Sequence, residues 1–217
     1  MHSEGKTKTL VQCDFDGTIT VGDVSFVLLD TFADEGWRQL LKEYQDGKMS
    51  VGRFNASAFA MVKADRKTLL SVARNTLKLR PGFHELVACC REKGFRFVIV
   101  SNGLDFYIEE VLKYTGETGI EFFAAKTQFH PEGLKVQYIG PDGNSVDSDF
   151  KGAYVNLFLI EGYRVLYVGN GDSDFSPAKR CHYVFATDNL LAHCRQARLD
   201  CVPFTDLNEV ARVIERL

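Results

Sequence analysis

The stretch VQCDFDGTIT, residues 11–20, places two aspartates directly after a run of apolar side chains. The apolar run predicts a short buried strand over residues 9–14, and a strand that continued would carry Asp14 and Asp16 on one face. Two neighbouring carboxylates repel each other, and removing them from water costs free energy. The chain must therefore expose this pair, neutralise it with cations, or use it in chemistry.

Beyond this stretch, segments typical of strands alternate with segments typical of helices. Short apolar runs predict strands over 95–101, 120–126, 163–169 and 182–186. Apolar residues at helical spacing predict helices over 82–94, 105–116, 151–162, 174–181, 189–199 and 206–217. Residues 129–145, with Pro-Glu-Gly and Pro-Asp-Gly turns, predict a small antiparallel excursion. The alternation predicts an α/β fold, a Rossmann-like parallel sheet with helices on both faces.

Residues 23–78 break this alternation, because their apolar side chains follow helical spacing throughout. Asp34, Ser50 and Asp65 are expected to cap the later helices of this segment. We therefore expect an inserted helical cap domain. The predicted division assigns residues 1–21 and 79–217 to the Rossmann-like catalytic core and residues 22–78 to the cap.

The overall composition excludes several classes of function. The chain has 217 residues, is 45% hydrophobic and 25% charged, and carries a net charge of -3, which gives no bulk attraction to nucleic acid or an anionic membrane. The N-terminal MHSEGKTKTL lacks the apolar core of a signal peptide, and no stretch has the length of a membrane span. The six cysteines form no CxxC pair, and most of them are expected to be small buried side chains. We expect a cytoplasmic protein.

Polar side chains follow several of the predicted strands. Ligands of open parallel sheets bind beyond the carboxyl ends of the strands, so these side chains should meet at one edge. They are Asp14 and Asp16, the run Ser101-Asn102-Gly103, Lys151 at the start of a helix, and the run from Asn170 to Asp174. Carboxylate and amide oxygens suit Mg²⁺, while a hydroxyl, backbone N–H groups and an ammonium suit a phosphate. The sequence therefore predicts a site for a hard cation and a phosphorylated anion.

Four motifs in order resemble those of the haloacid dehalogenase superfamily of phosphohydrolases. They are DFDGT, VSNG, a lone lysine before a helix, and GNGDSD, and the resemblance spans residues 10 to about 187. The inserted segment resembles the helical cap of the phosphoserine-phosphatase-like branch, and LRPGFHELV is similar to that branch. The stretches SNGLDFYIEEVL and FATDNLLAHCRQARLDCVPFTDLNEV are most similar to the phosphatases of methionine salvage.

The resemblance implies a two-step mechanism and a role for each matching residue. Asp14 would attack phosphorus, and Asp16 would protonate the leaving alcohol and then activate water. Mg²⁺ would let Asp14 approach a dianion. Lys151 would offset the concentrated negative charge, orient Asp14 and bind phosphate. The backbone N–H groups of Gly17-Thr18, the Ser101 hydroxyl and the Asn102 N–H are further phosphate-binding groups, so the predicted phosphate site is Thr18, Ser101, Asn102 and Lys151.

The fourth motif departs from the family pattern at one position. The family generally has an acid directly after the first glycine, where this chain has Asn170, while Asp174 keeps its spacing. An amide oxygen can bind Mg²⁺ but brings no formal charge. The predicted metal ligands are Asp14, the Asp16 carbonyl and Asn170, with Asp174 just behind or bridging through water. Asp172 is the alternative to Asn170 if the loop shifts.

The cap should decide the substrate. Asp23 lies nine residues after Asp14, where it either contacts the substrate or caps the first cap helix. Arg53 is the nearest cation to the position where a phosphoserine phosphatase would need one, and its surroundings, with Phe26 and Phe54, are apolar. An apolar cap pocket favours a neutral or partly apolar phosphoester.

Three classes of function remain open from the sequence. The first is a Mg²⁺-dependent phosphatase that hydrolyses a small phosphorylated metabolite through an aspartyl phosphate, with the enol phosphate of methionine salvage or phosphoserine as substrate. The second is a phosphotransferase that uses the same intermediate. The third is a non-enzymatic, phosphate-binding regulatory protein, in which Asn170 has weakened the metal site. No nucleic-acid or membrane partner is expected.

Overall fold

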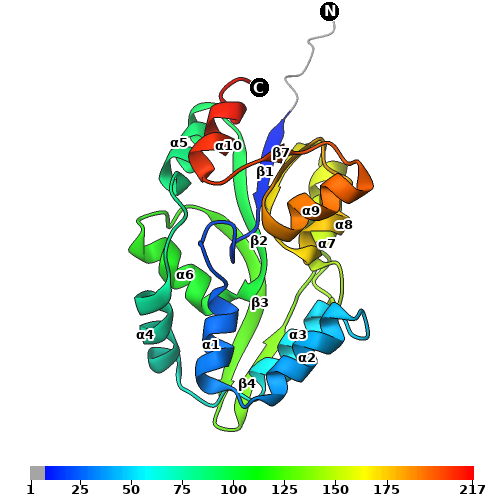
Figure 1. Ribbon diagram of the computed structural model, residues 1–217. Helices are drawn as coiled ribbons and strands as arrows, with labels where there is room; N and C mark the ends of the chain where they lie inside the picture. Colours follow the sequence, from blue (N-terminus) through cyan, green and yellow to red (C-terminus); the bar gives the residue numbers. More distant parts are fainter. Residues whose placement is uncertain (1–7) are drawn as a thin grey trace, which may run out of the picture.

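The structure is a computed structural model that describes residues 8–217. Its centre is a seven-stranded sheet in the order β4-β3-β2-β1-β5-β6-β7 (Figure 1). All neighbouring strands pair in parallel except β3 and β4, which are antiparallel. The strands are β1 Thr9–Cys13, β2 Arg96–Leu104, β3 Glu121–His130, β4 Gly133–Gln137, β5 Arg164–Gly169, β6 Tyr183–Ala186 and β7 Val202–Pro203. This sheet confirms the α/β fold predicted from the sequence.

Helices cover both faces of the sheet. Figure 1 shows α5, α6 and α10 on one side of the central strands and α7, α8 and α9 on the other. The helices are α5 Phe83–Glu92, α6 Asp105–Tyr114, α7 Phe150–Ile160, α8 Asp172–Ala178, α9 Asp188–Ala197 and α10 Leu207–Ile214. β1 is fully buried between these layers, because its five residues expose less than a tenth of their surface. The DFDGT motif therefore begins directly after a central buried strand.

Two strands, β2 and β7, differ from the sequence prediction. β2 does not end at Ser101 but continues to Leu104, with a shift in its pairing to β3 between Val100 and Leu104. Such a bulge re-aims side chains near a site. The two-residue strand β7 at the sheet edge was not predicted from the sequence, because a pair of residues is too short to show an alternating pattern.

Four helices fill the segment between β1 and α5. They are α1 Val24–Phe32, α2 Gly36–Gln45, α3 Val51–Phe59 and α4 Arg66–Thr76. Ser50 and Asp65 accept from backbone N–H groups of the first turns of α3 and α4, which confirms these caps. Asp34 is a correction: Glu35 occupies the cap position of α2, although Asp34 Oδ1 still accepts from the Gly36 N–H at 2.8 Å.

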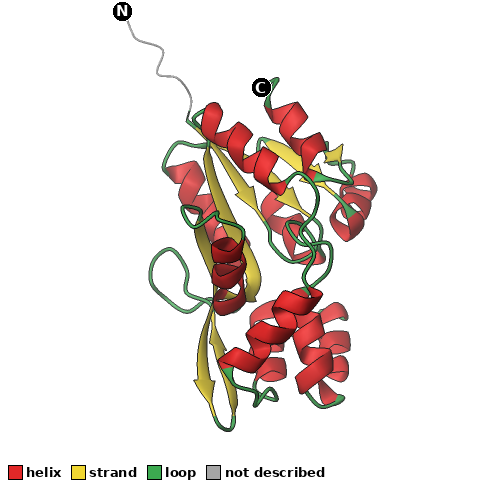
Figure 2. Cartoon of the chain, turned by 90° about the vertical axis from the view of Figure 1, so that its left-hand side faces the viewer, coloured by secondary structure: helices red, strands yellow, loops and turns green. Residues whose placement is uncertain are grey.

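The four inserted helices contact the core in two places. α1 packs on α4, and α4 in turn packs on α6, whereas α2 packs on α3, which lies against β4 (Figures 1 and 2). The close contact of α3 with the β3–β4 hairpin requires Gly133, because a Cβ there would collide with the carbonyl group of Ala60. The predicted excursion 129–145 thus supports the second half of the cap.

The two chain crossings between the inserted helices and the core lie side by side. The Val21 N–H donates to the Lys78 carbonyl at 2.9 Å, and the Arg80 N–H donates to the Ile19 carbonyl at 2.8 Å. The expected boundaries, after residues 21 and 78, fall within this paired segment. The division into two domains stays a prediction.

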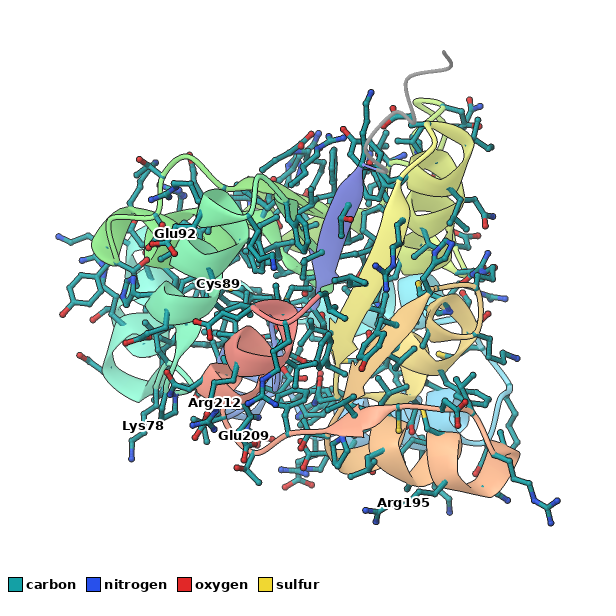
Figure 3. All side chains as sticks on the ribbon, turned by 90° about the horizontal axis from the view of Figure 1, so that it is seen from above. Lys78, Cys89, Glu92, Arg195, Glu209 and Arg212 are labelled. Carbon is teal, nitrogen blue, oxygen red and sulfur yellow. The ribbon has the colours of Figure 1, made fainter. Side chains whose placement is uncertain are left out.

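The described cysteines are all free, and Cys13, Cys89, Cys90 and Cys194 are buried. Figure 3 labels Cys89 on α5, where its thiol donates to the Ala211 carbonyl of α10 at 3.6 Å. Among residues 8–217, no helix has the length and apolar composition needed to cross a membrane.

Candidate active site

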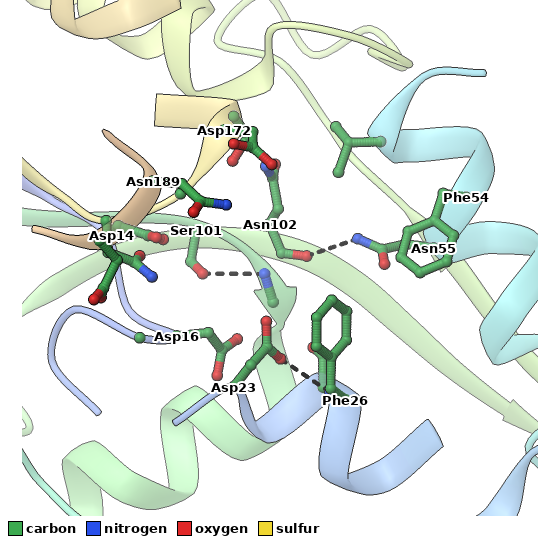
Figure 4. Close-up of a pocket in the computed structure, with 18 of the residues that line it drawn as sticks. Asp14, Asp16, Asp23, Phe26, Phe54, Asn55, Ser101, Asn102, Asp172 and Asn189 are labelled. Atoms are coloured by element: carbon green, nitrogen blue, oxygen red, sulfur yellow. Dashed lines mark hydrogen bonds between the residues drawn. The ribbon is translucent and has the colours of Figure 1, made fainter. Parts of the chain in front are cut away.

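A cavity of about 330 Å³ lies at the carboxyl ends of β1 and β2. Figure 4 shows side chains from the core and from the inserted helices around it. The residues that line the cavity include Asp14, Asp16, Asp23, Phe26, Phe54, Asn55, Ser101, Asn102, Lys151, Asn170 and Asp172. The structure thus brings together most of the residues predicted to form the site.

Lys151 joins two carboxylates behind the cavity. Its Nζ lies 2.9 Å from Asp14 Oδ1 and 2.6 Å from Asp174 Oδ1, and the side chain is 3% exposed. Burial alone would lower the pKa of Lys151, but the charges of Asp14 and Asp174 raise it above its ordinary value. The lysine therefore remains an ammonium ion and supplies a fixed positive charge beside Asp14.

Asp174 has no free oxygen to offer a ligand. Oδ1 accepts from Lys151 and from the Tyr167 hydroxyl, at 2.6 and 2.7 Å, and Oδ2 accepts from the N–H groups of Asn170 and Gly171, at 3.0 and 2.8 Å. The side chain is fully buried and does not line the cavity. Asp174 thus lies behind the predicted metal position and holds Lys151 and the loop after β5 in place.

Asp14 follows β1 directly, and its N–H donates to the Val168 carbonyl of β5 at 2.9 Å. Burial and the charge of Asp174 raise the pKa of Asp14 to about 7, although Lys151 opposes both. Asp14 Oδ1 faces Lys151, which leaves Oδ2 for the cavity. A buried carboxylate held by an ammonium ion has the orientation that a nucleophile needs.

Asp16 is held by groups that lie far from it in the sequence. Oδ1 accepts from the Val24 N–H at 3.0 Å, and Oδ2 accepts from the Tyr107 hydroxyl, which also contacts Ser25 Oγ at 2.9 Å. Burial, followed by the charge of Asp23, raises the pKa of Asp16 well above its ordinary value. A carboxyl group with a raised pKa can be protonated near neutral pH, as a general acid must be.

Tyr107 lies in the stretch SNGLDFYIEEVL, but it was not predicted as a site residue, because it is separated from Asp16 by 91 positions. Gly103 is the one residue nearby whose identity reflects this contact between Tyr107 and Asp16. A Cβ at this position would collide with both the Tyr107 hydroxyl and Asp16 Oδ2, so the contact depends on glycine.

Ser101 and Asn102 lie on the bulged part of β2. Ser101 Oγ accepts from the Gly103 N–H at 3.0 Å, and the Asn102 carbonyl accepts from Asn55 Nδ2 at 3.1 Å and from the Tyr138 hydroxyl at 2.5 Å (Figure 4). Both residues line the cavity. The cap residue Asn55 and the excursion residue Tyr138 therefore fix the backbone that was predicted to bind phosphate.

Thr18 is a correction to the predicted phosphate site. Its N–H donates to the Phe15 carbonyl at 3.2 Å, its Oγ1 donates to Asn170 Oδ1 at 2.9 Å, and it does not line the cavity. Gly17 does line the cavity, at a φ of 75°, and a Cβ there would collide with the Asn170 amide. Thr18 therefore positions Asn170, and the glycine before it allows the close approach.

The donor set of the cavity suits a hard cation. The carboxyl groups of Asp14, Asp16 and Asp23 line the cavity together with the Asn170 amide, and these are oxygen ligands of the kind that a hard cation binds. Within residues 8–217, no group of three or more His, Cys, Asp or Glu side chains is arranged to hold a metal ion. A cation here would need amide and backbone oxygens as well, which agrees with the predicted set of Asp14, the Asp16 carbonyl and Asn170.

Asp172 also lines the cavity but has a partner elsewhere. Its Oδ1 lies 2.8 Å from His193 Nε2, and both side chains are more than a third exposed. Asn170 instead has its side chain held against Thr18, beside Gly17. This arrangement favours Asn170 over Asp172 as the metal-binding side chain.

The residues proposed for substrate contact divide into two groups. Phe26 and Phe54 line the cavity, whereas Arg53 is exposed and lies outside it, so the structure does not place Arg53 in the site. Asp23 lines the cavity and also caps α1, because its Oδ1 accepts from the Phe26 N–H at 2.9 Å. Burial raises the pKa of Asp23 to about 6. The position of Asp23 is therefore compatible both with contact to the substrate and with capping of α1.

Comparison with known proteins places this geometry in context. A 2-hydroxy-3-keto-5-methylthiopentenyl-1-phosphate phosphatase from Geobacillus kaustophilus is 30% identical over 217 residues, which is 97% of this chain and 98% of the relative. The protein of the same name from Geobacillus thermodenitrificans is 29% identical, over 98% of each chain.

Solved structures show the same fold at lower identity. A structure described as a phospho-aspartyl intermediate analogue of phosphoserine phosphatase superposes with a TM-score of 0.72 at 20% identity, covering 96% of this chain and 99% of the other. A substrate-bound phosphoserine phosphatase superposes with a TM-score of 0.70 at 19% identity, with the same coverage.

The family profile agrees with these relatives and with the motifs around the cavity. The profile described as haloacid dehalogenase-like hydrolase matches residues 11–179, a range that includes Asp14, Ser101, Lys151 and Asn170. The sheet order, the lysine that bridges two carboxylates and the sequence match all point the same way, and this chain belongs to the haloacid dehalogenase-like hydrolases.

Proposed function

We propose that the protein is a phosphatase that hydrolyses a small-molecule phosphomonoester through a phosphorylated Asp14. The observation that carries this proposal is the contact of Lys151 with Asp14 at 2.9 Å, in a cavity that Asp16 and Ser101 also line. A nucleophile, an acid and a group that binds phosphoryl oxygen thus converge on one space.

In the first step, an oxygen of Asp14 would form a bond to phosphorus while the bond to the leaving alcohol breaks. Asp16 would give a proton to that alcohol oxygen, and burial, followed by the charge of Asp23, favours the protonated form by raising the pKa of Asp16. Lys151 would hold Asp14 and offset its charge, and Ser101 would donate to a phosphoryl oxygen. The products of this step are the alcohol and an acyl phosphate on Asp14.

In the second step, Asp16 would take a proton from a water molecule that attacks phosphorus. The acyl phosphate bond would break, and inorganic phosphate and free Asp14 would result. Mg²⁺, held by Asp14, the Asp16 carbonyl and Asn170, would neutralise negative charge on the phosphoryl group. The Tyr107 hydroxyl keeps Asp16 aimed at the cavity in both steps.

The cavity wall favours one substrate class. Phe26 and Phe54 give the cap side an apolar surface, and Lys151 is the sole Lys or Arg among the described residues that line the cavity. Lys151 already contacts two carboxylates, so no lining cation is left to bind the carboxylate of phosphoserine. The likeness to phosphoserine phosphatases, at 20% identity or below, supports the fold alone.

A substrate with an apolar tail and no carboxylate fits this wall better. The named substrate of the relatives, 2-hydroxy-3-keto-5-methylthiopentenyl-1-phosphate, has these properties. We therefore propose this enol phosphate of methionine salvage as the substrate, with phosphoserine as the alternative to be tested against it.

The test is phosphate release by the full chain with Mg²⁺, measured on this enol phosphate, on phosphoserine and on p-nitrophenyl phosphate. The expected result is a higher kcat/KM on the enol phosphate than on phosphoserine, with loss of turnover on chelation by EDTA and recovery on added Mg²⁺. Equal or better turnover of phosphoserine would overturn the substrate proposal. Absence of turnover on all three would overturn the phosphatase proposal in favour of a phosphate-binding role.

A further inference from the structure

Asn55 on α3 has one polar atom to which the proposed mechanism gives no role. The residue is 5% exposed and lines the cavity. Its Nδ2 donates to the Asn102 carbonyl at 3.1 Å and to the Tyr138 hydroxyl at 2.5 Å. Within the part of the chain that the structure describes, its Oδ1 has no hydrogen-bond partner, and this atom is not sealed off from the cavity.

The neighbours of Asn55 decide which end of its amide faces them. A backbone carbonyl can only accept, so the atom beside the Asn102 carbonyl must be the nitrogen. The Tyr138 hydroxyl donates its proton to the same carbonyl at 2.5 Å and is left to accept from Nδ2. Turning the amide over would place two acceptors, Oδ1 and the Asn102 carbonyl, beside each other and leave the single Tyr138 proton to serve only one of them, so Oδ1 faces away from the Asn102 carbonyl (Figure 4).

Oδ1 of Asn55 is a hydrogen-bond acceptor, so a bound substrate would have to supply a donor to it. Oδ1 opens on the cavity, so a substrate that fills the cavity displaces solvent from this atom and must offer it a hydrogen bond, or the acceptor is left unpaired. The side chains of Phe26 and Phe54, which line the same cap side of the cavity, have no polar atom to offer. A phosphate or carboxylate oxygen cannot serve either, because both groups accept. A hydroxyl group of the substrate can.

The same contacts place Oδ1 near the phosphoryl end of the cavity. Nδ2 binds the carbonyl of Asn102, the residue directly after Ser101, whose hydroxyl is proposed to hold a phosphoryl oxygen. A donor that reaches Oδ1 therefore lies in the part of the cavity that Ser101 and Asn102 line, which is the part proposed to hold the phosphoryl group.

We propose that Asn55 is a specificity-determining residue, whose Oδ1 accepts a hydrogen bond from a substrate hydroxyl next to the phosphate-bearing carbon. The inference rests on the proposed function and narrows its substrate class to 2-hydroxyalkyl or 2-hydroxyalkenyl phosphates. The named substrate of the relatives has a hydroxyl on carbon 2 and the phosphate on carbon 1, which is the required arrangement.

The test compares two probes that differ by one hydroxyl group, 2-hydroxypentyl phosphate and pentyl phosphate. For the wild-type full chain, we expect kcat/KM to be roughly tenfold higher for the hydroxylated probe, since a site with an unpaired acceptor rejects an analogue that lacks the donor. Asn55→Leu removes the acceptor and should bring this ratio to about one, whatever it does to the absolute rates.

Two control variants separate this role from a structural one. Tyr138→Phe removes the hydroxyl that binds both the Asn102 carbonyl and Asn55 Nδ2. The remaining bond from Nδ2 to the Asn102 carbonyl still sets which way the amide of Asn55 faces, so the rate is expected to fall on both probes while the ratio is retained. Asn189→Leu applies the same substitution to an exposed asparagine at the cavity and should leave the ratio unchanged.

Three results would overturn the inference. The first is a wild-type ratio of kcat/KM near one for the two probes, a result that does not depend on any variant being folded. The second is an Asn55→Leu variant that lowers kcat/KM equally for both probes and so keeps the wild-type ratio. The third is a Tyr138→Phe variant that abolishes the ratio, because Asn55 would then act only through the backbone of Asn102. Hydrolysis of p-nitrophenyl phosphate by the wild type distinguishes these results from failure of the phosphatase proposal, in which no ester would be cleaved.

Discussion

At the scale of single residues, the charge balance of the site depends on Lys151. It lies between Asp14 and Asp174, at 2.9 and 2.6 Å, and all three side chains are buried. Two carboxylates this close would repel each other, and Asp174 does raise the pKa of Asp14. Lys151 thus supports the fold, because its charge makes burial of the Asp14 and Asp174 carboxylates tolerable, and in the proposed mechanism it also orients the nucleophile.

Replacing Lys151 by methionine should therefore destabilise the protein as well as inactivate it. Removing one partner of a buried ion pair leaves uncompensated charge, which costs roughly 3–5 kcal/mol of the free energy of unfolding. Urea unfolding followed by circular dichroism measures this loss. A Lys113→Met variant, which breaks an exposed pair with Glu109, is the control and should change stability by less than about 1 kcal/mol. Equal effects of the two variants would contradict this role of Lys151.

Asp14→Asn should abolish turnover and leave the fold intact. The amide keeps the shape of the side chain but does not attack phosphorus, and it relieves the repulsion from Asp174. Phosphate release from p-nitrophenyl phosphate is expected below about 1% of wild type, a loss in keeping with removal of a nucleophile, with a Tm at or above the wild-type value. Activity at more than a few per cent would remove Asp14 from the nucleophile role.

Asp16→Asn should separate substrates by their leaving groups. The amide has no proton to give to an alkoxide, whereas p-nitrophenolate leaves without one. We expect a loss in kcat of roughly a hundredfold or more on pentyl phosphate, and a smaller loss on p-nitrophenyl phosphate. Comparable losses on the two esters would show that Asp16 does not protonate the leaving group.

At the scale of elements, the sequence predicted the sheet better than the loops that hold the site. The motifs located the ends of β1 and β5 and the start of α7, whereas β2 continues past the predicted end at Ser101 to Leu104. The motif residues still meet, because parallel strands place their carboxyl ends at one edge. The partners of these loops were not predictable. Tyr107 reaches Asp16 from α6, and Tyr138 reaches Asn102 from the excursion, through contacts between residues far apart in the sequence.

Thr18 shows the same limit within a motif. It was assigned to phosphate by resemblance, yet its hydroxyl donates to Asn170 at 2.9 Å and joins the loop after β1 to the loop after β5. Thr18→Val keeps the shape and removes this bond. We expect the Mg²⁺ concentration for half-maximal activity to rise several-fold, since a freed Asn170 is a poorer ligand. The KM for substrate at saturating Mg²⁺ should stay within about twofold, because Thr18 lies outside the cavity. A large rise in that KM would restore Thr18 to the phosphate site.

At the scale of the whole molecule, the inserted helices were predicted as one cap, and the structure gives them two separate supports. α4 rests on α6, while α3 rests on β4, and the cavity lies where α1 and α3 approach the ends of β1 and β2 (Figure 1). The helical spacing of residues 23–78 could not show this, because it defines which face of a helix is apolar but not which partner covers it. In the proposed mechanism, the chemistry takes place at the sheet edge, and we expect the inserted helices to select the substrate.

Arg53 and Phe54 test whether the cap selects the substrate, because these adjacent residues of α3 face different surroundings. Phe54 is 2% exposed, stacks on Tyr44 at 5.6 Å between ring centroids and lines the cavity, whereas Arg53 is exposed and lies outside it. Phe54→Leu should lower kcat/KM for the methylthio enol phosphate by roughly tenfold, through loss of apolar contact in a desolvated pocket. Acetyl phosphate is too small to reach this wall and should lose less than about twofold.

Arg53→Ala is the matched control and should leave both substrates within about twofold of wild type. Thermal unfolding must show that Phe54→Leu remains folded at the assay temperature, since a buried aromatic side chain also contributes to stability. If Phe54→Leu lowered both substrates equally, α3 would merely support the loop at Asn102, and the cap would not select the substrate through its apolar wall. If Arg53→Ala raised KM for phosphoserine alone, the cap would move in solution to bring Arg53 to the site, and the preference for a substrate without a carboxylate would fail.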